Sequence, residues 1–186
     1  MRRVFDICGS LILIIVFFPV IILITILLKI SSNGPVLFWA PRLGLNERPF
    51  EMPKFRTFKV GTPILASNLI KDPESLYSPM GRFLRRFSID ELPQLYCILK
   101  GEMTFIGPRP CLGNQEDLIS LRREHDLFSI KPGVSGWAQV NGRDEISLEK
   151  KIELDLEYLQ KRSFFFDFKI ISMTIIKVLK SDNITH

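Results

Sequence analysis

The longest apolar stretch of the chain lies near its N-terminus. Leu11 to Leu28 contains no charged side chain, and a run of this length is just enough to predict a membrane helix. Pro19 lies in the middle of the run, where its missing N–H removes a helical hydrogen bond and bends the helix. Arg2 and Arg3 precede the run and Lys29 follows it, so the positive-inside rule favours the cytoplasmic side for both flanks. A bent helix that enters one leaflet and returns satisfies these features together, and a straight span stays open.

Two stretches after the apolar run have the pattern of strands. Pro35–Trp39 and Phe50–Phe58 are rich in apolar and aromatic residues, which predicts two short strands. Lys54 and Arg56 lie two residues apart in the second stretch and therefore share one face. Two cations on one face can bind a phosphate, and an ordinary solvated strand edge has the same pattern.

The remaining stretches predict short helices and loops. Gly61–Ser75 is polar and contains two prolines, which indicates a loop. An apolar stripe predicts a helix over residues 95–100, and Gly101 ends it. Phe164–Leu179 is dense in Phe and Ile but is interrupted by three charged residues, a pattern typical of a helix at a membrane interface.

These patterns predict an α+β fold. It consists of a kinked re-entrant membrane helix over residues 1–30 and a small cytoplasmic domain over residues 31–186, with short strands and interfacial amphipathic helices. No pattern of a long parallel sheet is apparent.

Composition narrows the classes of partner and of metal. The net charge of +5 suits nucleic acid or an anionic membrane surface, and the apolar segment favours the membrane. Cys8, Cys97 and Cys111 have no metal-ligand spacing, which suits a reducing compartment. His125 and His186 are the two histidines. A zinc site or a histidine base is therefore disfavoured, and a metal would be a hard cation bound by oxygen.

The most informative motif is the segment Ser88–Gln94, which carries two adjacent carboxylates. Ser88 and Glu91 have the spacing of a capping box, but that helix would carry Pro93 as its fifth residue and lose a hydrogen bond. A helix that starts or kinks at Pro93 instead places Asp90 and Glu91 beside a positive helix end, which attracts phosphate oxygens. The local pattern leaves capping and phosphate chemistry both open.

Arginines flank this acidic pair in the sequence. Arg85 precedes it, and Arg109 follows it between Pro108 and Pro110. A planar guanidinium binds two phosphate oxygens at once. Arg143 adjoins glycine-containing loops whose N–H groups can bind anions. The candidate phosphate-binding residues are therefore Lys54, Arg56, Arg85, Arg109 and Arg143.

Taken together, the order of the motifs resembles a known family. They are Lys54-Phe55-Arg56-Thr57, Asp90-Glu91-Leu92-Pro93-Gln94, Leu99-Lys100-Gly101-Glu102-Met103, Gly107-Pro108-Arg109-Pro110, Lys131-Pro132-Gly133 and Trp137-Ala138-Gln139-Val140-Asn141-Gly142-Arg143. Over nearly its whole length the chain is similar to the bacterial sugar transferase family. It resembles the small monotopic phosphoglycosyl transferases that start lipid-linked glycan assembly, such as the bacillosamine transferase type. We therefore expect the protein to be one of the small members and not one of the larger ones, which have a long multispanning N-terminal region.

The resemblance implies a reaction and the residues that carry it. A nucleoside diphosphate sugar, with uridine as the expected base, and polyprenyl phosphate would give polyprenyl diphosphate sugar and a nucleoside monophosphate. Asp90 would attack the sugar-linked phosphate and form a covalent phosphosugar intermediate. Glu91 would be the partner carboxylate, and Asp90 and Glu91 together would hold Mg²⁺. Many relatives have a serine before the membrane proline; this chain has Phe18, so Pro19 alone would cause the bend.

The resemblance also implies where the protein acts and with what. We expect it on the cytoplasmic face of the bacterial inner membrane, with the two substrates, the membrane and possible downstream glycosyltransferases as partners and with no nucleic acid. Two other classes stay open. One is a magnesium-dependent phosphohydrolase that acts on sugar nucleotides with water as acceptor. The other is a non-catalytic membrane-binding module in which the acidic pair only caps a helix.

Overall fold

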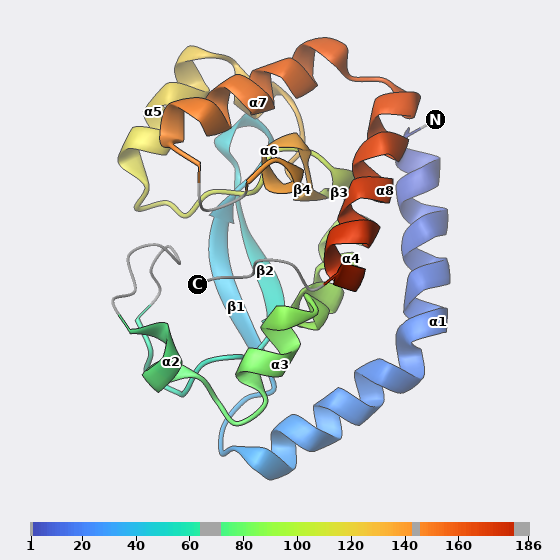
Figure 1. The fold of residues 1–186 in the computed structure, drawn as a ribbon, viewed down its shortest axis with the longest axis vertical. Helices are drawn as coiled ribbons and strands as arrows, with labels where there is room; N and C mark the ends of the chain where they lie inside the picture. Colours follow the sequence, from blue (N-terminus) through green and yellow to red (C-terminus); the bar gives the residue numbers. More distant parts are fainter. Residues whose placement is uncertain (1, 64–71, 143–145, 181–186) are drawn as a thin grey trace.

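The computed structural model describes residues 2–63, 72–142 and 146–180 and has an α+β fold (Figure 1). Its α-helices are α1 (Arg2–Ser31), α2 (Pro73–Leu76), α3 (Gly81–Arg86), α4 (Leu95–Lys100), α5 (Glu116–Glu124), α6 (Trp137–Val140), α7 (Leu148–Lys161) and α8 (Phe164–Lys180). Its strands are β1 (Leu37–Leu43), β2 (Pro49–Phe55), β3 (Thr104–Ile106) and β4 (Gly133–Ser135). Three short 3₁₀ helices are η1 (Leu45–Glu47), η3 (Ile89–Gln94) and η4 (Leu127–Ser129). The predicted fold class is confirmed.

Strands β1 and β2 form an antiparallel hairpin. Both predicted strands are present, but β1 extends beyond the predicted Trp39 to Leu43 because Pro41 is accommodated in the hairpin, opposite Glu51. A two-stranded hairpin has only edge strands, where a proline can point its nitrogen away from the partner strand. Arg56 lies one residue beyond the end of β2. The predicted loop over residues 61–75 lies partly outside the described residues, and its C-terminal end forms α2.

Helix α1 is continuous from Arg2 to Ser31, contains Pro19 and bends near its middle (Figure 1). Near the C-terminal end of α1, Ile24 and Leu28 are buried against Phe55 and Leu84. Many of the remaining large apolar side chains of α1 are exposed. Among the described helices, α1 is long and apolar enough to cross a membrane by length and composition. The predicted bend is present, and burial of α1 in a lipid bilayer stays a prediction.

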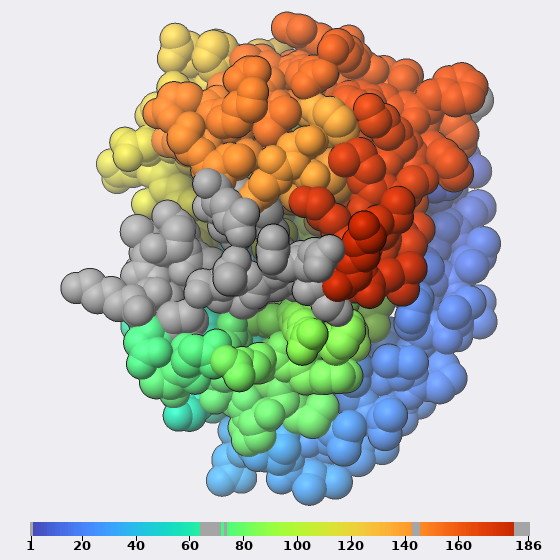
Figure 2. Space-filling view, in the orientation of Figure 1, coloured from blue at the N-terminus to red at the C-terminus, as the bar shows by residue number. Residues whose placement is uncertain are grey.

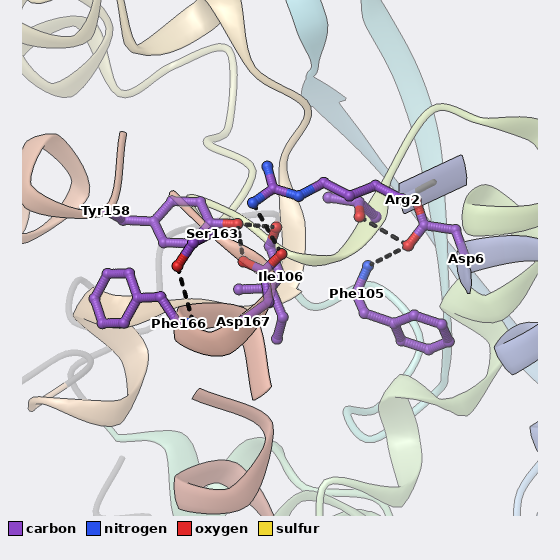
Figure 3. Close-up of polar contacts among 9 residues, drawn as sticks. Arg2, Asp6, Phe105, Ile106, Tyr158, Ser163, Phe166 and Asp167 are labelled. Atoms are coloured by element: carbon purple, nitrogen blue, oxygen red, sulfur yellow. Dashed lines mark hydrogen bonds and ion pairs between the residues drawn. The ribbon is translucent and has the colours of Figure 1, made fainter. Parts of the chain in front are cut away.

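The N-terminal turns of α1 are attached to the rest of the molecule by polar contacts (Figure 3). Arg2 forms an ion pair with Asp167 of α8 at 3.1 Å. The buried carboxylate of Asp6 accepts hydrogen bonds from the Thr104 hydroxyl at 2.9 Å and the Phe105 N–H at 3.3 Å, both in β3. Because Tyr158 of α7 also hydrogen-bonds to Asp167, at 2.7 Å, the contacts join α1, α7, α8 and β3.

Helix α8 runs beside the N-terminal part of α1 along one side of the molecule (Figures 1 and 2). The rings of Phe5 and Phe164 lie edge to face with their centroids 6.1 Å apart. Ile170 is fully buried on one side of α8, while Phe165 and Phe168 are exposed on another. This distribution is the amphipathic pattern predicted for the segment, and its place at a membrane interface stays a prediction.

Strands β3 and β4 form a short parallel pair. A side chain at Gly133 would collide with the backbone nitrogen of Gly107, so this close approach requires glycine. The N–H of Gly133 donates to the carbonyl of Pro108 at 2.9 Å, and the N–H of Gly107 donates to the carbonyl of Ser135 at 2.9 Å. The end of β3 therefore fixes the start of the Pro108–Pro110 segment.

Candidate active site

A cation from β2 and a cation from the loop after β3 meet the two adjacent carboxylates of η3. Lys54 Nζ lies 2.7 Å from Glu91 Oε1 and 3.8 Å from Asp90 Oδ2. Arg109 Nη2 lies 3.3 Å from the same Glu91 Oε1. The structure thus brings together four of the residues predicted from sequence.

The local sequence explains how the two carboxylates reach this place. Ser88 has a left-handed φ of 53° and its side chain makes no capping hydrogen bond. The capping-box alternative is therefore wrong. The chain instead forms η3, which contains Pro93, and then α4, which ends as predicted at Gly101 with φ +87°. The predicted start or kink at Pro93 is wrong, because a short 3₁₀ helix that begins at Ile89 accommodates the proline and the α-helix begins only at Leu95. Glu91 lies in this 3₁₀ helix and forms ion pairs.

The carboxylates and their cations are largely shielded from water. Asp90 is 6% exposed, and the side chains of Lys54 and Glu91 are 16% and 10% exposed. Burial lowers the pKa of Lys54, and the carboxylates of Glu91 and Asp90 oppose this shift. Lys54 and Arg109 both stabilise the Glu91 carboxylate, and burial strengthens each of these charge interactions.

Arg42 is a further basic residue of this site that was not predicted from the sequence. The hairpin register pairs Phe38 with Lys54 and Arg42 with Phe50, so Arg42 and Lys54 lie on the same face. Burial and the nearby Arg109 lower the pKa of Arg42 to about 10. The two-residue period of a strand would have placed Arg42 on the same face as Phe38. The predicted strand stopped at Trp39 and therefore did not include Arg42.

The guanidinium of Arg42 makes only part of its hydrogen bonds to the described residues. Its Nη1 donates to the carbonyl of Pro110 at 3.2 Å, while its Nε is buried and, within the described residues, has no hydrogen-bond partner. Buried cations are ordinarily paired. Together Lys54, Arg42 and Arg109 outnumber the two carboxylates by one charge, so this group of residues favours an additional anion.

Arg85 reaches the neighbourhood of the site through two aromatic rings. Phe58 and Tyr77 stack with ring centroids 5.1 Å apart, and the Arg85 guanidinium lies 4.9 Å from the Phe58 centroid. Tyr77 lies within electrostatic reach of both Arg85 and Asp90, and burial raises its pKa. Phosphate binding by Arg85 stays a prediction.

Arg56 and Arg143 do not join the described group. The buried Arg56 donates to the carbonyl of Asn33 at 2.9 Å and to the hydroxyl of Ser32 at 2.5 Å. It therefore ties β2 to the end of α1, and its two-residue spacing from Lys54 does not give the two side chains the same partners. Arg143 lies outside the described residues. A phosphate contact by either arginine stays a prediction.

The two carboxylates of the site fit a magnesium ion that is bound jointly by the protein and by substrate phosphates. The described residues contain no group of three or more His, Cys, Asp or Glu side chains that could hold a metal alone. Mg²⁺ is commonly bound by one or two carboxylates together with substrate phosphates. Asp90 and Glu91 supply the two carboxylates, so a metal here would need oxygens from a bound phosphate.

Comparison with known proteins identifies a family and several relatives that match nearly the whole chain. The family model of the bacterial sugar transferases matches residues 1–181. The uncharacterized sugar transferase EpsL of Bacillus subtilis (strain 168) is 40% identical over 186 residues, which cover 99% of this chain and 90% of that protein.

Two further relatives carry more specific names. The UDP-glucose:undecaprenyl-phosphate glucose-1-phosphate transferase of Escherichia coli (strain K12) is 37% identical, over 95% of this chain and 40% of its own length. The UDP-N-acetylgalactosamine-undecaprenyl-phosphate N-acetylgalactosaminephosphotransferase of Aeromonas hydrophila is 33% identical, over 96% of this chain and 43% of its own length. The chain therefore spans less than half of each of these two proteins.

Proposed function

Because the chain belongs to the bacterial sugar transferase family, we propose that it is a polyprenyl-phosphate sugar-1-phosphate transferase. It transfers a sugar 1-phosphate from a uridine diphosphate sugar to polyprenyl phosphate and releases UMP. The observation that carries this proposal is the buried Asp90–Glu91 pair, whose carboxylates lie within 3.8 Å of Lys54 Nζ. Relatives named for transfer of glucose 1-phosphate or N-acetylgalactosamine phosphate to undecaprenyl phosphate support it.

The proposed reaction has two displacements at the same phosphorus atom. An Asp90 carboxylate oxygen forms a bond to the sugar-linked phosphorus, and the bond from that phosphorus to the UMP oxygen breaks. A phosphate oxygen of the polyprenyl phosphate then attacks the same phosphorus and displaces Asp90. The products are UMP and polyprenyl diphosphate sugar, and the enzyme is regenerated with its carboxylate free of the sugar phosphate.

The surrounding charges make this attack of one anion on another feasible. Lys54 and Arg109 form ion pairs with Glu91, so each lies where it can stabilise charge that develops on the phosphoryl oxygens. Arg42, whose Nε is buried and without a partner in the described structure, completes the set as a ligand of the diphosphate. A bound Mg²⁺, held by Asp90 and Glu91, would neutralise phosphate charge.

The proposed membrane arrangement follows from the contacts of α1. The N-terminal end of α1 contacts the domain through Arg3, which donates to the carbonyls of Ile98 and Leu99 at 2.5 Å each. Its C-terminal end contacts the same domain through Ser32 and Arg56. Both ends of a re-entrant helix lie on one side of the membrane. These contacts support the re-entrant arrangement. Because Arg2, Arg3 and Lys29 flank the apolar run and basic flanks favour the cytoplasmic side, we propose that the protein lies on the cytoplasmic face of the inner membrane and that its lipid product passes to downstream glycosyltransferases.

An assay with purified protein and a panel of UDP-sugars tests the proposal. With polyprenyl phosphate present, we expect UMP and polyprenyl diphosphate sugar in equal amounts, dependent on Mg²⁺ and absent in Asp90→Asn. Release of sugar phosphate without lipid would instead identify a phosphohydrolase. A folded protein that binds acidic vesicles but turns over no UDP-sugar would be a non-catalytic membrane module.

A further inference from the structure

A buried ion pair outside the carboxylate site contacts the backbone of the Arg109 loop. Arg122 of α5 and Asp155 of α7 are 5% and 1% exposed, and Arg122 Nη2 lies 2.9 Å from Asp155 Oδ2. The other terminal nitrogen, Arg122 Nη1, donates to the carbonyl of Arg109 at 2.7 Å. One guanidinium thus joins α7 to the residue whose side chain contacts Glu91.

The Arg109 loop needs such support because of its prolines. Pro108 and Pro110 have no N–H and cannot fix the loop by donating hydrogen bonds. The loop is instead bound through four consecutive carbonyls. Those of Pro108, Arg109, Pro110 and Cys111 accept from Gly133 N, Arg122 Nη1, Arg42 Nη1 and Leu43 N at 2.9, 2.7, 3.2 and 3.1 Å.

The burial of the pair needs an explanation beyond stability. Desolvating two charges costs several kcal/mol per ion, and well-packed apolar residues often replace a buried pair without loss of stability. Burial raises the pKa of Asp155, and the Arg122 guanidinium opposes this shift. What an apolar pair would lack is the donor to the Arg109 carbonyl.

We propose that the Arg122–Asp155 pair is a positioning device that sets the place of the Arg109 guanidinium at the reacting phosphate. Asp155 fixes the orientation of the Arg122 fork, and Arg122 fixes the Arg109 backbone between its two prolines. Because both side chains are buried, the proposed role of the pair is to position Arg109 and not to bind substrate. The inference rests on the proposed function for its effect on rate, since a shift of about 1 Å in a positioning group can cost about a hundredfold.

A double-mutant comparison tests the device in the full chain. Arg122→Met combined with Asp155→Leu keeps the site packed but removes the donor. We expect kcat/KM to fall at least about tenfold, mainly through kcat, with a Tm close to that of the parent. In an Arg109→Ala background the same two changes should have less than about a twofold effect, because the side chain that they position is gone.

The control is the exposed ion pair between Arg123, which follows Arg122 in α5, and Glu47 of η1. Arg123 binds Glu47 through two nitrogens at 2.9 and 2.7 Å, and its side chain is 61% exposed. Arg123→Leu should leave kcat/KM within about twofold of the parent. An undiminished rate in the Arg122→Met, Asp155→Leu protein would overturn the proposal. So would an equal fold-loss with and without the Arg109 side chain, which is the result of a purely structural role.

Hydrogen exchange separates this inference from the proposed function. In Asp155→Asn, a milder change, we expect faster exchange at the amides of Arg109, Cys111 and Leu112, with little change in α4. This measurement needs no substrate. If the parent transfers no sugar phosphate, the proposed function fails. The exchange rates then still show whether the Arg122–Asp155 pair holds the Arg109 loop in place. Unchanged exchange in this loop would overturn the positioning role even in an active enzyme.

Discussion

Lys54 Nζ lies 2.7 Å from Glu91 Oε1 and 3.8 Å from Asp90 Oδ2, so one buried cation from β2 serves both adjacent carboxylates of η3. Arg109 shares the Glu91 oxygen at 3.3 Å. Glu91 is therefore the residue through which both cations are positioned, whereas Asp90 has the longer contact with Lys54. This asymmetry supports different roles for the two carboxylates, with Asp90 as the nucleophile and Glu91 as the residue that organises the charges.

Asp90→Asn should abolish UMP release and leave the fold intact. The amide keeps the shape of the side chain but loses the charge that attacks phosphorus. The measurement is a single-turnover assay without polyprenyl phosphate, with UDP-sugar labelled in the phosphate next to the sugar, in which the parent should retain label and the variant should not. Near-parental turnover by a well-folded variant would exclude a covalent role for Asp90.

Glu91→Gln should affect both rate and stability. Its loss leaves Lys54 and Arg109 close together without their shared carboxylate, which should reduce the free energy of unfolding by at most about 3 kcal/mol. The variant should also need more Mg²⁺ for half-maximal rate. A magnesium titration and a denaturant titration check the two effects separately. An unchanged magnesium profile would count against Glu91 as a metal ligand.

The local sequence left helix capping and phosphate chemistry both open for these two carboxylates, and the structure brings them together with Lys54 and Arg109. The sequence predicts the first strand only in part. The predicted strand stopped at Trp39, but an isolated hairpin tolerates a proline such as Pro41 on its open edge, so β1 continues to Leu43 and carries Arg42 into the site. A local pattern cannot reveal which strand lacks a neighbour, and Arg42 was missed for that reason.

Tertiary partners were the least predictable part of the site. Lys54 and Arg56 have the spacing of a single phosphate-binding face, yet Lys54 contacts Glu91 while Arg56 contacts the end of α1. Arg56 lies just beyond the end of β2, where its N–H donates to the carbonyl of Val36 at 2.9 Å and its side chain reaches Ser32 and Asn33. Arg122 and Asp155 gave no sequence signal, since charged residues on amphipathic helices are usually solvated.

Arg109→Lys should lower kcat/KM at least about tenfold, equivalent to about 1.4 kcal/mol of transition-state stabilisation. Lysine keeps the charge but cannot bind two phosphate oxygens in the plane of a guanidinium. Steady-state kinetics with UDP-sugar as the varied substrate measures the loss, and Arg123→Lys is the matched control on an exposed ion pair. Parental kinetics in Arg109→Lys would assign Arg109 a structural role.

Lys54 should set the alkaline limit of activity. Burial lowers its pKa below the ordinary value of 10.5, and a lysine loses its charge as pH rises through its pKa. The cation is therefore lost at a lower pH than for an exposed lysine. The pH profile of kcat/KM reports groups of the free enzyme. In the parent, the midpoint of its alkaline limb should lie below pH 10.5. Lys54→Arg should move this limb to higher pH, and the exposed Lys59→Arg should not. A limb that stays in place in Lys54→Arg would assign it to another group.

The bend of α1 predicts its topology. In a Cys8→Ser background, Val4→Cys and Ile30→Cys each introduce a single exposed thiol near one end of α1. Because Arg3 and Ser32 tie the two ends to one domain, we expect an impermeant reagent to label both thiols only from the cytoplasmic side.

Pro19→Ala restores the N–H that proline lacks and favours a straighter helix, and Phe18 provides no serine hydroxyl to preserve the bend. Straightening would pull one end away from the domain, so this variant should show mixed labelling or reduced transfer to polyprenyl phosphate. Labelling of Val4→Cys from the outer side in the protein with Pro19 intact would establish a full span and reject the re-entrant helix, while leaving the transferase assignment in place.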